Sequence, residues 1–188
     1  MANNKLIISD AVLIAACAYG FIGGGVSGKK YAVVALILYL ASGIFNVANE
    51  LTNNNNIRKC DHHCFYVSNT CGIDLLVTEI CILSSVDEKL ALLNLIPPAV
   101  DLIMWYASEN WDPITPMTHI VSIGLMGYFA FKDSKYILIV SGVAFLFSIF
   151  GTKNDERYFV NAFNALGVFA SSWFLGGKDL KDMGIDIG

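Results

Sequence analysis

Residues 6–26 read LIISDAVLIAACAYGFIGGGV and residues 31–51 read YAVVALILYLASGIFNVANEL, and these two apolar runs decide the fold class. The short connection between them contains Lys29 and Lys30. A helix that crosses the hydrocarbon core of a bilayer needs roughly 20 mostly apolar residues. A Lys or Arg at its centre costs about 2.5–3.5 kcal/mol. The sequence therefore predicts two neighbouring transmembrane helices with basic residues at the membrane surface.

Five more apolar stretches repeat this pattern along the chain. We expect spans over residues 64–86, 90–107, 114–131, 136–151 and 158–176, and the 90–107 span should bend at Pro97–Pro98. Of the 188 residues, 55% are apolar and 15% are charged, whereas soluble domains carry about 25% charged residues. We predict one all-α domain over residues 1–188, a polytopic transmembrane helix bundle of about seven spans. Its short loops should make neighbouring helices antiparallel.

The distribution of charge bears on partners and orientation. A net charge of −4 without a basic patch excludes a nucleic-acid-binding surface. The expected partners are the lipid bilayer and either further copies of this chain or other membrane subunits. No motif implies a cofactor. Seven basic residues fall on the C-terminal side of the predicted spans and five on the other, which predicts a cytoplasmic C-terminus. The seven are Lys29, Lys30, Lys89, Lys132, Lys135, Lys178 and Lys181, and the five are Lys5, Arg58, Lys59, Lys153 and Arg157.

Ionisable residues inside the predicted spans are candidates for function, because burying them in lipid is costly. The four that lie deepest are Asp74, Glu79, Asp101 and His119. Asp101 follows the two prolines, whose missing N–H groups leave backbone carbonyls free to share a cation with a carboxylate. Asn94 lies two turns earlier, on nearly the same face. We predict a cation or proton site here; the alternative is that Asp101 caps a neighbouring backbone group.

The other ionisable residues allow two interpretations each. Asp74 and Glu79 are five positions apart, so they point about 140° apart around a helix and do not share one face. They either line a polar path or are neutral or paired inside a central helix. His119 is either a proton relay or a histidine whose ring bonds to a neighbour.

Amide side chains form two further groups within the spans. Asn46, Asn49 and Glu50 share one face of the second span, and Asn161 and Asn164 lie one turn apart in the last span. Amides on facing helices commonly form hydrogen bonds between helices. We therefore expect these residues to lie at helix interfaces.

A cysteine- and histidine-rich segment occupies the expected polar loop over residues 52–63 and the start of the third span. It contains Cys60, His62, His63 and Cys64, and Cys71 follows. Three kinds of chemistry fit these residues. They are a disulfide on an oxidising side of the membrane, a zinc site of two Cys and two His, and a reactive thiol.

Residues 61–72, DHHCFYVSNTCG, resemble the core of the DHHC protein S-acyltransferases. The resemblance covers twelve residues and places the motif between the second and third helices, as in that family. It implies that Cys64 accepts the acyl chain as nucleophile and that His63 or His62 acts as base. The zinc-binding cysteines that precede the motif in that family are absent here, and Cys71 lies one position later than the corresponding family cysteine.

Three functions follow from these features. The first is a small ion, proton or solute transporter or channel that uses the intramembrane acidic residues. The second is a structural or assembly subunit of a membrane complex, in which the same polar groups hold helices together. The third is a membrane thiol enzyme that uses the segment around Cys64, either as an acyltransferase or in thiol redox chemistry.

Overall fold

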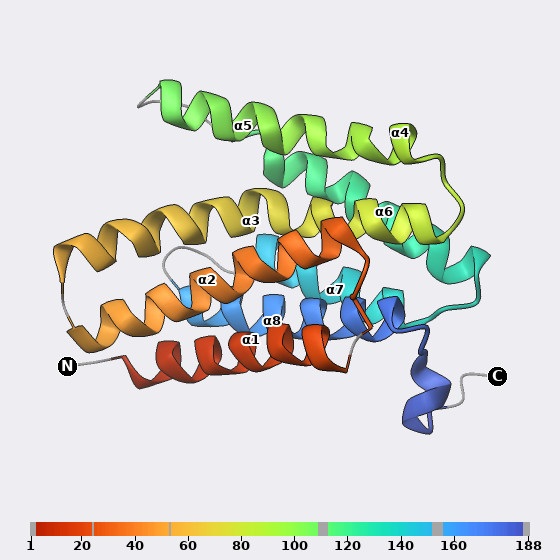
Figure 1. The fold of residues 1–188 in the computed structure, drawn as a ribbon, viewed down its shortest axis with the longest axis horizontal. Coiled ribbons are helices and arrows are strands. Elements are labelled where there is room, and N and C mark those ends of the chain that lie inside the picture. The colour runs from red at the N-terminus through yellow and green to blue at the C-terminus, as the bar shows by residue number, and fades with distance from the viewer. Residues whose placement is uncertain (1–2, 24, 53, 109–112, 152–155, 186–188) are drawn as a thin grey trace.

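The computed structural model describes residues 3–23, 25–52, 54–108, 113–151 and 156–185, and these form helices without a strand (Figure 1). The helices are α1 (Asn4–Ile22), α2 (Lys30–Thr52), α3 (Asn55–Leu83), α4 (Glu88–Ala91), α5 (Ile96–Ala107), α6 (Thr115–Lys132), α7 (Ile137–Phe150) and α8 (Arg157–Leu175). Two short 3₁₀ helices, η1 (Leu92–Leu95) and η2 (Leu180–Met183), complete them. Since η1 joins α4 to α5, the described chain has seven long helical segments, which confirms the predicted fold class.

Four of these segments are long and apolar enough to cross a membrane. They are α1, α2, α3 and the broken segment Glu88–Ala107, with 19, 23, 29 and 20 residues. At a rise of about 1.5 Å per residue, even the shortest approaches the roughly 30 Å thickness of a hydrocarbon core. The apolar helix α7 is shorter, with 14 residues.

The segments follow one another around a ring. Contacts join α1 to α2, α2 to α3, α3 to α6, α6 to α7 and α7 to α8, and α8 packs back against α1. The broken segment α4–α5 lies outside this ring, against α3 and α6 (Figure 1). Helix α3 thus belongs to the ring and also contacts the outer segment. Most of its second half is buried.

One prediction about local structure was wrong. The expected polar loop over residues 52–63 is largely helix, because α3 begins at Asn55 and the side chain of Asn54 caps it by accepting from the Asn56 N–H. At the expected bend, the helix changes from 3₁₀ to α just before Pro97–Pro98: η1 ends at Leu95, and the prolines occupy the first turn of α5. A missing N–H costs nothing in a first turn, since those groups have no intrahelical partner.

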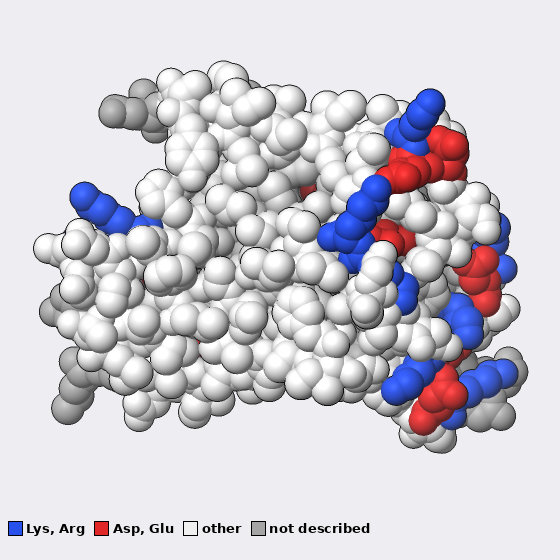
Figure 2. Space-filling model, in the orientation of Figure 1, with Lys and Arg blue, Asp and Glu red and all other residues white. Residues whose placement is uncertain are grey.

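Charged side chains gather at one end of the bundle, and a broad uncharged zone crosses the face shown in Figure 2. The seven basic residues assigned to the C-terminal side all lie at this end, where α2 and α4 begin and α6 and α8 finish. At the other end lie Lys5, Arg58, Lys59 and Arg157, whereas Lys153 is outside the described residues. This separation is compatible with an integral membrane protein, and the cytoplasmic C-terminus stays a prediction.

The tight crossing of α2 and α3 gives a test of this packing. Tyr39 is completely buried, and a Cβ added at Gly72 would lie 2.5 Å from its ring. We expect Gly72→Ala to lower the unfolding temperature of the detergent-purified protein, with a loss of about 1–3 kcal/mol from overpacking. Gly124→Ala on α6 is the matched control, because nothing lies within 4 Å of its added Cβ. Equal unfolding temperatures for the two variants would contradict this packing.

Candidate functional site

Buried carboxylates in this protein accept hydrogen bonds from the first N–H groups of helices. Glu79 accepts from the N–H of Tyr31 at 2.9 Å and of Ala32 at 3.4 Å, at the start of α2. Asp179 accepts from the Ile137 N–H at 3.0 Å, at the start of α7. The first N–H groups of a helix have no partner within it, and its positive dipole end favours a carboxylate. Where such a group is buried within the protein, it needs a protein acceptor.

Asp101 has the same role at the start of α6. Its carboxylate accepts from the Ile114 N–H at 3.1 Å and the Thr115 N–H at 2.6 Å, and it also bonds the Thr115 hydroxyl. Asp101 therefore fixes the entry of α6 against α5. This geometry matches the capping alternative of the sequence interpretation.

Asp74, His119 and Asn94 do come together, in a buried cluster between α3, η1 and α6. His119 Nδ1 lies 3.1 Å from Asp74 Oδ2, and the two side chains are 3% and 1% exposed. Ser122 donates its hydroxyl to Asp74 Oδ1, and its oxygen also lies 2.9 Å from Asn94 Oδ1. We call Asp74, His119, Ser122, Asn94 and Asn69 the Asp74 cluster.

Backbone groups set the orientation of the cluster's side chains. The Asn94 amide donates to the Asp74 carbonyl at 3.1 Å, so that its own oxygen faces Ser122. On the other side, His119 Nε2 lies 2.9 Å from the Asn69 carbonyl oxygen. Thr78 donates to the Asp74 carbonyl at 2.7 Å, within α3. Both the imidazole and the amide are thus held in one orientation.

Asp74 and His119 bring a carboxylate and an imidazole together in a buried site. The Asn69 carbonyl can only accept, so His119 Nε2 carries a hydrogen. His119 Nδ1 then faces Asp74 Oδ2 at 3.1 Å, and neither atom forms a hydrogen bond of good geometry among the described residues. Polar atoms left unpaired in a buried site are unfavourable, and a proton placed on either atom would join the two.

Helix α8 presents one polar face to the interior of the ring. Residues at positions i, i+4 and i+7 share a helix face, and α8 places Arg157, Asn161 and Asn164 in this way. Arg157 donates to Asp61 Oδ2 at 2.8 Å, Asn161 to Asp10 Oδ1 at 2.7 Å, and Asn164 to Asn69 Oδ1 at 3.0 Å. The last of these bonds joins α8 to the Asp74 cluster.

The three polar side chains that were expected on one face of α2 have different environments. Asn46 is completely buried, Asn49 donates to Asp61 Oδ2 at 3.3 Å, and Glu50 accepts from the Asn3 N–H at 2.9 Å. Among the residues that matter, sequence reasoning missed Ser122, Asn69 and the Asp61–Arg157 pair. The spacing of Ser122, one turn after His119, was the available signal.

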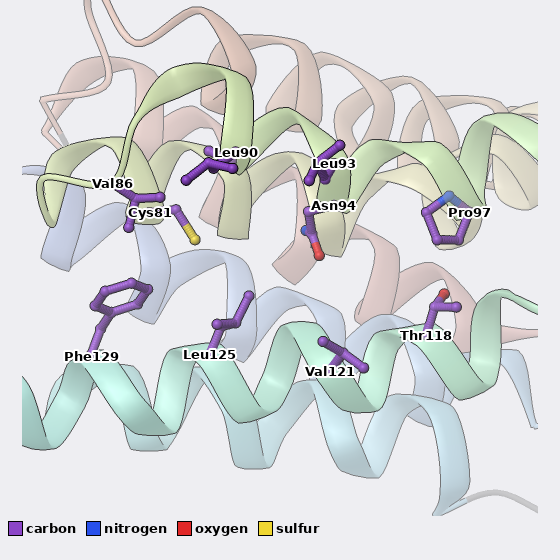
Figure 3. Close-up of a pocket in the computed structure, with 11 residues that line it drawn as sticks. Cys81, Val86, Leu90, Leu93, Asn94, Pro97, Thr118, Val121, Leu125 and Phe129 are labelled. Atoms are coloured by element: carbon purple, nitrogen blue, oxygen red, sulfur yellow. The ribbon is translucent and has the colours of Figure 1, made fainter.

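Two pockets adjoin the Asp74 cluster. The first, of about 360 Å³, lies between α4, η1 and α5 on one side and α6 on the other (Figure 3). Asn94 points into it among apolar side chains such as Leu93, Val121 and Leu125. The second, of about 300 Å³, is lined by His119 and Asn69 together with Tyr66 and Ser148. The cluster therefore contributes polar groups to both pockets.

The cysteine- and histidine-rich segment belongs to α3 and is no loop. Cys60, Cys64 and Cys71 are free thiols, so no disulfide joins them. Successive residues of a helix point about 100° apart, and the segment's side chains separate accordingly. Asp61 turns inward to Arg157, whereas the ring of His63 contacts Trp105 and Tyr106, 5.2 and 5.9 Å away between centroids.

This geometry bears on the thiol and zinc alternatives. His62 and His63 are exposed, and Asp61, which bonds Arg157 and Asn49, orients neither of them. Within the described part of the chain, no three His, Cys, Asp or Glu side chains are grouped closely enough to hold a metal ion. Among the described residues, neither His62 nor His63 forms a hydrogen bond with Cys64, and the reactive thiol stays a prediction.

Comparison with known proteins gives no relative for this fold and site. No protein-family model matches the chain, and neither a curated protein nor a solved structure does. The chemistry of the site therefore has to be argued from its own geometry.

The capping role of Asp101 can be tested by substitution. Asp101→Ala should lower the unfolding temperature, since buried N–H groups left without an acceptor cost about 1–3 kcal/mol. Asp101→Asn should be milder because the amide oxygen still accepts. Glu88→Gln is the control, as Glu88 pairs with Lys30 in an exposed position and such pairs contribute little. A loss for Asp101→Asn equal to that for Asp101→Ala would argue against capping.

Proposed function

We propose that this chain is a proton-transfer membrane protein, either a small proton channel or a proton-coupled transporter. The observation that carries the proposal is the buried Asp74–His119 pair, whose facing atoms lie 3.1 Å apart and which adjoins two pockets. Ionisable residues inside membrane bundles commonly mark proton relays, and imidazole is suited to gaining and losing a proton near neutral pH.

The Ser122 hydroxyl supplies the next step of such a relay. It has one hydrogen but lies near two acceptors, Asp74 Oδ1 and Asn94 Oδ1. An ionised Asp74 holds that hydrogen. When Asp74 Oδ1 is protonated, it donates to Ser122, and the hydroxyl hydrogen turns to Asn94. Proton binding at Asp74 thus changes the hydrogen bonding of an amide that lines the pocket of Figure 3.

The polar face of α8 supports an access route from one end of the bundle. A polar pocket of about 460 Å³ lies there, lined by Arg157 and Asp61 with Arg58, Lys59 and His62 among others. From Arg157 the face continues through Asn161 to Asn164, which bonds to Asn69 in the Asp74 cluster. We propose that this pocket is the aqueous entrance and that water completes the route inward.

The capping carboxylates favour a second function, the structural or assembly subunit. Glu79, Asp101 and Asp179 are each used to hold the start of another helix. A bundle whose acids serve packing needs no transport activity to explain them. The Asp74–His119 pair distinguishes the two functions, because it caps no helix.

Proton flux into liposomes that contain the purified protein tests the proposal. Wild type should dissipate an imposed pH gradient faster than empty liposomes. Asp74→Asn should slow this flux at least tenfold, because the variant removes the carboxylate of the pair. His119→Gln should do the same. Asp101→Asn is the control that changes a buried carboxylate outside the cluster, and its flux should stay near wild type.

Two results would overturn the proposal. One is a folded wild-type protein whose liposomes leak protons no faster than empty ones, which would favour the assembly subunit. The other is an Asp74→Asn variant with wild-type flux, which would place any proton path away from the Asp74 cluster.

A further inference from the structure

The pocket of Figure 3 is a long cleft between two helical walls, each of which presents one row of side chains. The broken segment α4–α5 forms one wall, and α6 forms the other. On α6 the lining runs from Thr118 to Phe129, which is about 16 Å at a rise of about 1.5 Å per residue. This length is close to half of the roughly 30 Å hydrocarbon core, the depth of one leaflet. The cleft therefore has the length of one acyl chain.

The polar side chains that line this pocket bond to other parts of the protein. The Asn94 amide donates to the Asp74 carbonyl, and its oxygen faces the Ser122 hydroxyl at 2.9 Å. The Thr118 hydroxyl donates to the Thr115 carbonyl at 2.9 Å. The rest of the lining is mainly apolar and is open to an occupant on both walls. An apolar chain is the occupant that such a lining accommodates.

A lysine stands at the end of the pocket that lies nearest the charged end of the bundle. The Nζ of Lys132 is 5.5 Å from the centre of the Phe129 ring, which lines the pocket. It also donates to the Ser84 carbonyl at 3.4 Å, in the turn between α3 and α4. An ammonium has three donors, so this bond leaves others for a ligand. Among the described residues, no acid forms an ion pair with Lys132.

This charge decides which amphiphile the pocket fits. In a bilayer, lipid chains contact exposed apolar side chains everywhere, so an apolar lining alone selects nothing. An ammonium at the mouth of the cleft attracts an anionic head group, and a carboxylate accepts its charge-assisted hydrogen bonds. Since each wall presents one row of side chains, the cleft suits a single chain that carries a single negative charge.

We propose that the pocket of Figure 3 binds a long-chain fatty-acid carboxylate, with the acyl chain between α4–α5 and α6 and the head group at Lys132. The inference deepens the proposed function and rests on it for the role of the ligand, because it names the substrate class of a proton-coupled transporter. Asn94 connects the two sites, since it lines the pocket and faces Ser122 of the Asp74 cluster. Binding itself requires neither Asp74 nor His119.

Photo-crosslinking in liposomes that contain the purified protein tests the site. The probe is a long-chain fatty acid with a diazirine in its chain, and mass spectrometry locates the labelled residues. The label should concentrate on the pocket-lining residues of η1 and α6. Val121→Trp, which places an indole in the pocket, should abolish this label. Ile120→Trp is the matched control, because Ile120 is the neighbouring exposed residue and does not line the pocket.

The head-group contact is tested with the same probe. Lys132→Gln should lower labelling by the acid about threefold, as expected for the loss of one exposed ion pair. Labelling by a fatty alcohol that carries the same diazirine should not change in this variant. Lys181→Gln removes an exposed lysine at the same end of the bundle, and it should change neither labelling.

Competition on the wild-type protein covers the case in which a variant does not fold. Excess unlabelled fatty acid should remove the pocket label, and the same excess of fatty alcohol should remove less of it. Equal competition by the two would overturn the carboxylate assignment, as would a diazirine phospholipid that labels the pocket as strongly as the acid.

Two further results would overturn the site itself. They are a label spread equally over the exposed faces of α1 and α2, and a label that persists in a folded Val121→Trp variant. Failure of the proposed function gives a different result, because a protein without proton flux that still shows the pocket label would keep the site and refute its transport role.

Discussion

The structure depends on one constraint, that the buried N–H groups at helix starts must find acceptors within the protein. Three helices meet it with a carboxylate from elsewhere in the chain: Glu79 for α2, Asp101 for α6 and Asp179 for α7. Each such bond ties one helix to the start of another. The acids therefore fix the relative positions of helices that apolar contacts alone would leave free to slide, because lipid competes equally for apolar surface.

This assignment changes which polar residues have to be explained by function. Asp101 is the acid for which the sequence predicts an ion site, because it follows two prolines within an expected span. Its bonds in the structure are those of a helix cap. Asp74 is less conspicuous, but it faces an imidazole, a hydroxyl and, through Ser122, an amide that reaches a pocket. A carboxylate that faces a buried imidazole is a better candidate for chemistry than one that stabilises a helix start.

The helices and the membrane-type fold could be predicted because apolar runs of membrane length have few alternatives. The start of α3 could not, since asparagine is a weak helix former and the polar run that includes Asn55 and Lys59 is typical of a loop. Asn94 and Asp101 were expected on one face of one α-helix, but Asn94 lies in the 3₁₀ helix η1 and Asp101 in α5. The partners of His119 could not be predicted either, because Asn69 and Asp74 lie on another helix, and only the packing of α3 against α6 brings them together.

The polar face of α8 has a consequence for biogenesis. Asp10 and Asn161 are separated by 151 positions, and Asp61 and Arg157 by 96. During synthesis from the N-terminus, α1 and α3 are made and inserted before the helix that carries their hydrogen-bond donors exists. Synthesis must therefore reach α8 before these two acids meet the donors of that helix. Until then, only the amides of α2, such as Asn49 for Asp61, can bond to them.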